Sequence, residues 1–107
     1  MATDRLRGQL DPMLLAVLAN GPAHGYAVIT DLHQRSGGVF DLPEGTVYPA
    51  LHRLERAGML TSSWEPGTTR RRRVYSLTAR GRRSLATERK QWKAFAGGVN
   101  LVLAGAT

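Results

Sequence analysis

EGTVYPALHRLERAGML, residues 44–60, is the stretch that decides the fold of this 107-residue chain. Side chains on an α-helix turn by about 100° per residue, so the stretch divides into two faces. One face is apolar and consists of Val47, Ala50, Leu51 and Leu54. The opposite face is largely basic and consists of Pro49, His52, Arg53 and Arg56. The spacing therefore predicts a helix with one buried face and one positively charged face.

A β-hairpin is expected directly after this helix. Residues 59–65 and 71–77 alternate between apolar and polar side chains, and Pro66-Gly67 between them is a strong turn signal. An unbroken arginine run lies beside the hairpin tip and comprises Arg70, Arg71, Arg72 and Arg73. Four adjacent like charges repel one another, which favours an anion as their partner over a merely solvated hairpin. Strand alternation sends them to two faces, so we do not expect all four to contact the same ligand.

Two shorter helices are expected before the basic helix. Asp11 is a suitable cap for the first, which Gly21 ends, and His24 helps to start the second, over residues 24–36. Residues 39–42 read as a brief strand, and residues 1–10 as either a basic arm or an extension that packs against a partner. Three short helices joined by tight Gly and Pro connections are typical of a helix-turn-helix arrangement.

A long final helix is expected over residues 79–104, with Thr78 as its cap. Its apolar stripe consists of Leu85, Trp92, Phe95, Val99 and Leu103. A helix that follows a complete small domain has little core left to cover, so we expect this stripe to form a dimer interface. Gly97-Gly98 weakens the helix by about 1 kcal/mol per glycine relative to alanine. The fold class is thus mostly α with a small β-hairpin (α+β), with residues 1–78 and 79–107 in a single compact unit.

Composition limits the function. Fifteen Lys and Arg against eight Asp and Glu give a net charge of +7, which indicates either an anionic polymer as partner or a solvated basic surface. The chain has no cysteine, so disulfides, thiolate zinc sites and thiol catalysis are excluded. The apolar run at residues 13–19 is too short for a membrane span and is bounded by helix start and stop signals. We therefore expect a cytoplasmic protein without membrane contact.

Enzyme chemistry is not indicated. The three histidines, His24, His33 and His52, are spread over two helices without a close carboxylate cluster, so no metal site is expected. The sequence contains no Gly-x-Ser-x-Gly, no phosphate-cradling glycine loop and no convincing carboxylate pair. Neither a cofactor nor a catalytic residue is therefore predicted.

Five blocks of sequence lie along the chain in a characteristic order. They are MLLAVL (residues 13–18), GPAHGY (21–26), EGTVYPALHRLE (44–55), GML (58–60) and RRVYSLT (72–78) with Gly81. Each block is weak alone, but their order and spacing are specific, and together they resemble the PadR family of transcriptional regulators. The resemblance implies a winged helix-turn-helix fold, a homodimer held by the C-terminal helix, and repression by binding an inverted repeat at a promoter. The short C-terminus resembles the small subgroup with a single terminal helix.

Double-stranded DNA is the expected partner of the basic helix and the arginine run. The residues expected to contact it are Thr46, Tyr48, Pro49, His52, Arg53, Arg56, Arg70, Arg71, Arg72 and Arg73. Arginine pairs readily with guanine, and a hydroxyl near a helix start suits a phosphate. Tyr48 lies between the two faces and could pack, contact a phosphate, or do both.

The terminal helix leaves a second question open. Some small members of the family that the chain resembles bind flat hydrophobic compounds between aromatic residues at the dimer interface, and Trp92, with Phe95 nearby, stands where such a residue is expected. Dimer packing alone also accounts for both residues. The alternative function for the whole chain is a winged-helix protein-interaction module without sequence-specific DNA binding.

Overall fold

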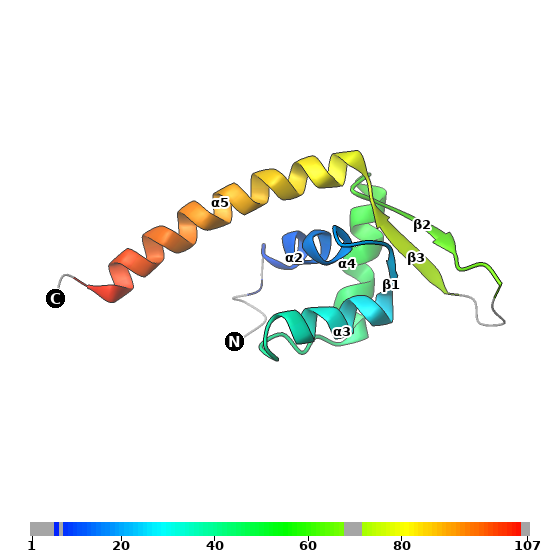
Figure 1. Ribbon diagram of the computed structural model, residues 1–107, viewed down its shortest axis with the longest axis horizontal. Helices are drawn as coiled ribbons and strands as arrows, with labels where there is room; N and C mark the ends of the chain where they lie inside the picture. The colour runs from blue at the N-terminus through cyan, green and yellow to red at the C-terminus, as the bar shows by residue number, and fades with distance from the viewer. Residues whose placement is uncertain (1–5, 7, 68–71, 106–107) are drawn as a thin grey trace.

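Short helices and strands precede the long terminal helix of the chain, and the last strand leads directly into that helix (Figure 1). The computed structural model describes residue 6, residues 8–67 and residues 72–105. In chain order the elements are α2 (Leu10–Leu18), β1 (Ala23–His24), α3 (Gly25–Arg35), α4 (Glu44–Arg56), β2 (Leu60–Trp64), β3 (Arg73–Leu77) and α5 (Ala79–Ala104). The fold is a winged helix, mostly helical with a small antiparallel sheet, and this confirms the predicted fold class.

The sheet has the strand order β1-β3-β2, with both pairs antiparallel. The predicted hairpin is β2 and β3, in which Leu60 lies opposite Leu77 and Trp64 lies opposite Arg73. The third strand, β1, was not predicted, because a two-residue strand is too short to show alternation. A strand was instead expected at residues 39–42. That prediction is wrong: the segment is irregular, and the Phe40 amide donates to Oγ of Ser36.

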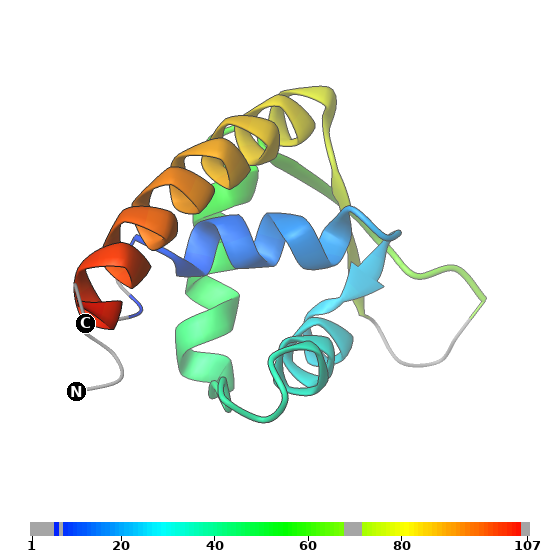
Figure 2. The ribbon, with the colours of Figure 1, turned by 60° about the vertical axis from the view of Figure 1, so that its left-hand side comes forward.

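The core lies where the apolar faces of α2, α3 and α4 meet the inner side of the wing. Its most buried members are Leu14, Leu15, Leu18, Val28, Val47, Leu51 and Tyr75. In both views α2 lies between α5 and α3, with α4 crossing behind it (Figures 1 and 2). Packing α4 by its apolar face alone leaves the opposite face of that helix exposed.

The residues that cap the helix N-termini agree with the predictions for α3 and α5 but not for α2. Nδ1 of His24 accepts from the Ala27 amide and so caps α3, and Oγ1 of Thr78 accepts from the Gly81 amide and caps α5. The prediction that Asp11 caps the first helix is wrong, because α2 begins at Leu10 after Gln9 and has no side-chain cap. Asp11 instead lies inside the first turn.

Helix α5 begins on the body and then leaves it. Its first two turns bury Gly81 and Leu85, whereas most side chains after Leu85 are exposed. The helix runs unbroken through Gly97-Gly98. The molecule is accordingly elongated, 60 × 27 × 20 Å, with the wing and the free end of α5 at opposite ends of its longest dimension (Figure 1).

Candidate nucleic-acid interface

The outer face of α4 is an open basic surface. Its exposed side chains include those of Pro49, His52, Arg53 and Arg56, while Val47, Ala50, Leu51 and Leu54 are buried as predicted. Pro49 lies inside the helix, where it cannot donate to the carbonyl of Gly45. Thr46 and Tyr48 are half-buried on the two flanks. We call the three central residues, Pro49, His52 and Arg56, the outer row of α4.

Arg53 lies apart from this row. Its Nη2 atom is 2.5 Å from Oδ1 of Asp11, so the guanidinium is directed toward the start of α2. Both side chains are partly exposed, and such a pair adds at most about 1 kcal/mol to stability. The pair spans 42 residues of sequence and orients α4 relative to α2. The charged or polar side chains of the outer row are therefore those of His52 and Arg56, which lie beside the ring of Pro49.

Tyr48 packs inward at the junction of α3 and α4. A methyl group at Gly25 would lie 2.5 Å from its Cε1 atom, so Gly25 makes room for the ring. The adjacent His52 ring lies 6.5 Å from the ring of Tyr75, centroid to centroid. Burial raises the pKa of Tyr75 above its ordinary value of 10.0; the negative charge of Glu55 adds to the rise and Arg73 opposes it. The Tyr75 side chain beside His52 is thus held as the neutral phenol.

A chain of hydrogen bonds joins α4 to the wing. Oγ of Ser62 in β2 donates to Oε2 of Glu55 in α4 at 2.6 Å, and accepts from Nε of Arg73 in β3 at 3.0 Å. The guanidinium of Arg73 also lies over the ring of Trp64, 4.7 Å from its centroid, as a cation–π contact. We call Glu55, Ser62 and Arg73 the wing brace. It joins the flank of α4 to both strands of the wing.

The sequence reasoning missed the wing brace, although a signal for it was present. Ser62 and Trp64 alternate onto one face of their strand, and Arg73 belongs to one face of the other. Pairing the two strands by the length of the hairpin would have brought these three side chains together. Glu55, on the flank of α4, then had a natural donor across the helix–sheet junction.

The other described wing arginine is also held within the fold. Nη2 of Arg72 lies 2.9 Å from Oε2 of Glu65, and its Nη1 lies 3.3 Å from Nε2 of His24. Arg70 and Arg71 lie outside the described residues. Arg72 and Arg73 therefore make intramolecular contacts at the end of β2 and β3 that lies nearest the hairpin turn.

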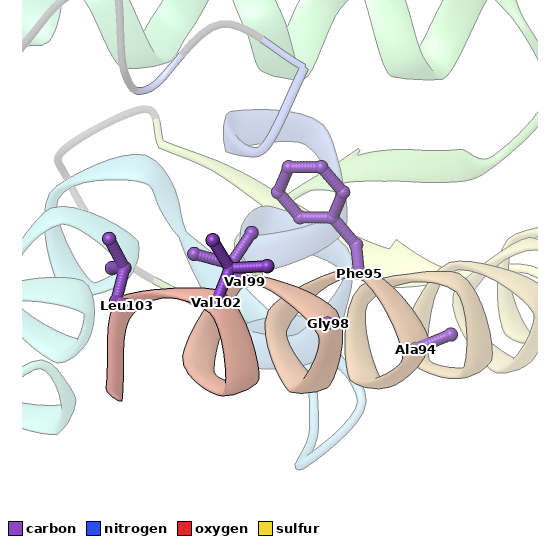
Figure 3. A pocket seen from close by; sticks show the side chains of 6 residues that line it. All are labelled: Ala94, Phe95, Gly98, Val99, Val102 and Leu103. Atoms are coloured by element: carbon purple, nitrogen blue, oxygen red, sulfur yellow. The ribbon is translucent and has the colours of Figure 1, made fainter. Parts of the chain in front are cut away.

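The predicted dimer residues fall into two groups. Trp92, Phe95, Val99 and Leu103 are exposed, by 50%, 64%, 37% and 78%, and lie on the part of α5 that projects from the body. Figure 3 shows Phe95, Val99, Val102 and Leu103 projecting from one side of the helix, where with Ala94 and Gly98 they line an apolar groove. Leu85 corrects the prediction. It is 3% exposed and packs in the core of its own chain, because the start of α5 covers that core.

A cavity of about 580 Å³ lies between the base of α5, α2 and the loop before α4. Leu6, Met13, Phe40, Leu85 and Trp92 are among its lining residues, so its wall is mainly apolar. This volume is in the range of small-molecule sites. Trp92 therefore lines the cavity, while Phe95 lines the neighbouring groove and its ring lies 5.9 Å from that of Trp92, centroid to centroid.

Each of the three histidines has an identified neighbour in its own part of the fold. His24 caps α3, His52 lies against Tyr75, and His33 lies near Gly38. Within the described ranges no three His, Asp or Glu side chains are grouped so as to hold a metal ion. Over those same ranges no helix has the length and apolar character that crossing a membrane requires.

An exposed basic helix that packs beside a three-stranded antiparallel sheet and is followed by a long helix is the arrangement typical of winged-helix DNA-binding proteins. The family model of the transcriptional regulator PadR-like family matches residues 14–87, from the second turn of α2 to the third turn of α5. The chain belongs to this family of transcriptional regulators, as the sequence blocks indicated.

Individual relatives agree. The chain is 40% identical over 72 residues to the transcriptional regulator Rv3488 of Mycobacterium tuberculosis. The matched region covers 67% of this chain and 64% of Rv3488. A PadR family transcriptional regulator from Eggerthella lenta is 32% identical, with a TM-score of 0.84 and coverage of 100% and 91%. Bacillus subtilis PadR, solved in complex with operator DNA, is 23% identical with a TM-score of 0.68, covering 75% of this chain and 46% of that one; it bears on the fold alone.

Proposed function

We propose that this regulator is a homodimeric repressor that reads an inverted-repeat operator with two copies of α4. The outer row of α4 enters the major groove, the start of the helix at Thr46 contacts a phosphate, and the wing contacts the flanking backbone. The observation that carries the proposal is the exposed outer row. His52 and Arg56 are open to a ligand, while the opposite face of α4 is buried in the core.

In this proposal the predicted DNA contacts divide into residues that read bases and residues that support the reading helix. Arg56 is free to pair with a guanine edge, because no described residue forms an ion pair or a side-chain hydrogen bond with it. The supports are three arginines with partners inside the fold. Arg53 pairs with Asp11, Arg72 pairs with Glu65, and Arg73 belongs to the wing brace, so that together they hold the reading surface in place. Tyr48 supports α4 against α3.

Dimerisation through α5 supplies the second reading helix. The apolar side chains from Trp92 to Leu103 are exposed in one chain, and a second copy of the same helix would cover them. One winged helix offers a short, poorly discriminating contact, whereas two at a fixed separation specify a site. In this proposal a flat hydrophobic effector in the cavity beside Trp92 displaces the contacts that set this separation and relieves repression.

Selection from random duplex DNA, followed by titration with variants, tests the proposal. The wild-type protein should enrich a palindromic motif. Arg56→Gln should weaken binding to that motif by about 10-fold to 100-fold, the effect of losing one bidentate base contact, and relax the preference at one position of each half-site. Arg35→Gln is the matched control, because it removes an exposed arginine from α3 that pairs with Asp31; its affinity should stay near wild type.

Two results would contradict the proposal. Absence of any enriched motif, together with capture of an acidic protein partner, would instead support a winged-helix protein-interaction module. Equal losses for Arg56→Gln and Arg35→Gln would mean that the outer row of α4 contributes charge and no base reading. The effector is tested separately, by quenching of tryptophan fluorescence with a flat aromatic cation, which Trp92→Ala should abolish and Trp64→Ala should retain.

A further inference from the structure

Most of the net positive charge lies outside the winged-helix body. Residues 1–78 hold nine arginines and seven carboxylates, a net charge of +2. Residues 79–107 hold six Lys and Arg and one glutamate, a net charge of +5. Residues 79–107, most of which form α5, therefore carry five of the seven net charges of the chain. A DNA-reading surface on α4 and the wing does not account for them.

Five of the six basic side chains of α5 lie on one side of the helix, and Arg80 lies outside this group. At about 100° per residue, five basic side chains fall within a third of the helix circumference. They are Arg82, Arg83, Arg89, Lys90 and Lys93, and all are exposed. We call them the basic face of α5. Arg89 lies at its edge and also lines the cavity, whereas Glu88, the single acid, lies on the other side of the helix. The centre of the basic face is thus turned away from Leu85 and the apolar stripe.

The basic face has no partner within the described part of the chain. None of its five side chains forms an ion pair or hydrogen bond there. The body differs, since Arg35, Arg53 and Arg72 each pair with a carboxylate and Arg73 bonds to Ser62. Like charges spaced three, four and seven residues apart on a helix also repel one another. An external polyanion would relieve this repulsion.

We infer that the basic face of α5 binds the phosphate backbone of a second DNA duplex, separate from the duplex that the outer row of α4 reads. From Arg82 to Lys93 the row extends about 16 Å at about 1.5 Å per residue, enough to follow several phosphates. Such contacts carry no sequence information. The regulator would thus hold one duplex by sequence and another by charge.

Duplex DNA fits this surface better than the other polyanions do. Between Arg82 and Lys93 the basic face contains only the small Ala86 besides the charged residues, so it offers no apolar anchor for a peptide. A membrane-surface helix inserts an apolar side next to its basic side, whereas Leu85 is buried in the body and a second copy of α5, in the proposed homodimer, would cover the apolar side from Trp92 to Leu103. Family membership makes DNA the polyanion that the protein meets.

Co-capture of two duplexes tests the inference. A biotinylated duplex with the selected site is bound to beads, and a fluorescent duplex without the site is added with the protein. The wild-type protein should retain the fluorescent duplex at low salt. The variant Arg82→Gln/Arg83→Gln/Lys90→Gln/Lys93→Gln should bind the site-bearing duplex but retain roughly tenfold less of the second. Its log–log salt slope for non-specific DNA should fall by about 0.9 per lost phosphate contact.

The control variant Arg82→Lys/Arg83→Lys keeps the charge and should retain the second duplex. Equal co-capture by the wild-type protein and the four-glutamine variant would overturn the inference. So would competition by polyglutamate or by phosphatidylserine vesicles that exceeds competition by DNA. Failure of the proposed function is recognised separately, by the absence of an operator motif. In that case the same experiment is run with two unrelated duplexes, and retention of the second duplex still decides this inference.

Discussion

Gly81 shows how closely single residues set the position of α5. A methyl group there would overlap the carbonyl oxygen of Met59 and lie 2.6 Å from Cδ1 of Leu77. The helix can therefore pass over the connection between α4 and β2 only because this position has no side chain. Gly97, in the same helix, has open space around it.

Replacing the two glycines should have opposite effects. Gly81→Ala is expected to lower the free energy of unfolding by about 2 to 3 kcal/mol, because the backbone at Met59 cannot move aside. Gly97→Ala should raise it by about 1 kcal/mol through helix propensity. Urea denaturation of both variants measures the difference. Equal behaviour of the two would mean that the contact at Gly81 relaxes without cost.

Tyr75 gives the fold a dependence on alkaline pH. Burial, reinforced by Glu55, raises its pKa in the folded state above 10.0, so the fold favours the neutral phenol. The stability that this provides is complete below about pH 10 and is lost as the pH rises through the folded value. Relative to Tyr75→Phe, which cannot ionise, the wild-type protein should lose stability only above about pH 10. Denaturation at about pH 8, 9.5 and 11 checks this; a constant difference across all three would contradict it.

At the scale of elements, the sequence predicted what is periodic and local. The bounds of α5 and the buried face of α4 follow from helical spacing, and the hairpin from alternation around Pro66-Gly67. The two-residue strand β1 has no period to detect. The attachment of the wing to α4 depends on Ser62 meeting Glu55 and Arg73, which requires the strand register as well as the pattern.

The wing brace should therefore matter to DNA binding without touching DNA. Ser62→Ala removes one acceptor and one donor at the centre of the brace, and should cost about 1 kcal/mol of stability and reduce operator affinity by freeing the wing. Ser63→Ala, on the exposed side of the same strand, is the matched control and should change neither. Unfolding and fluorescence anisotropy titrations measure the two effects. An operator affinity unchanged in Ser62→Ala would show that the wing angle is fixed by other contacts.

At the scale of the molecule, long-range pairings set the architecture and escape sequence reasoning. Arg53 and Asp11 meet although one was expected to contact DNA and the other to cap a helix. Leu85 was assigned to a partner chain but completes the core of its own, since only the folded structure shows where the body ends along α5. The predicted division of the chain into residues 1–78, for DNA binding, and residues 79–107, for dimerisation, stays a prediction.

The apolar stripe of α5 gives a direct test of assembly. Leu103→Asp places a charge on the stripe and should convert the proposed homodimer to a monomer, lowering operator affinity while the body stays folded. Leu101→Asp is the matched control, because Leu101 is equally exposed, at 78%, but lies off the stripe. Sedimentation velocity distinguishes the two. A Leu103→Asp protein that sediments like the wild type would exclude this end of α5 from the interface.

The position of Leu85 also bears on how the chain is made. It is the last residue of the core along the sequence, so a ribosome has produced every core residue before it adds Trp92, Phe95, Val99 or Leu103. Because domains fold from the N-terminal side during synthesis, the body can close before the apolar half of α5 emerges. A nascent chain would therefore expose the apolar stripe only after all core residues of the body have been made, an order that favours folding of the body over aggregation with neighbouring chains.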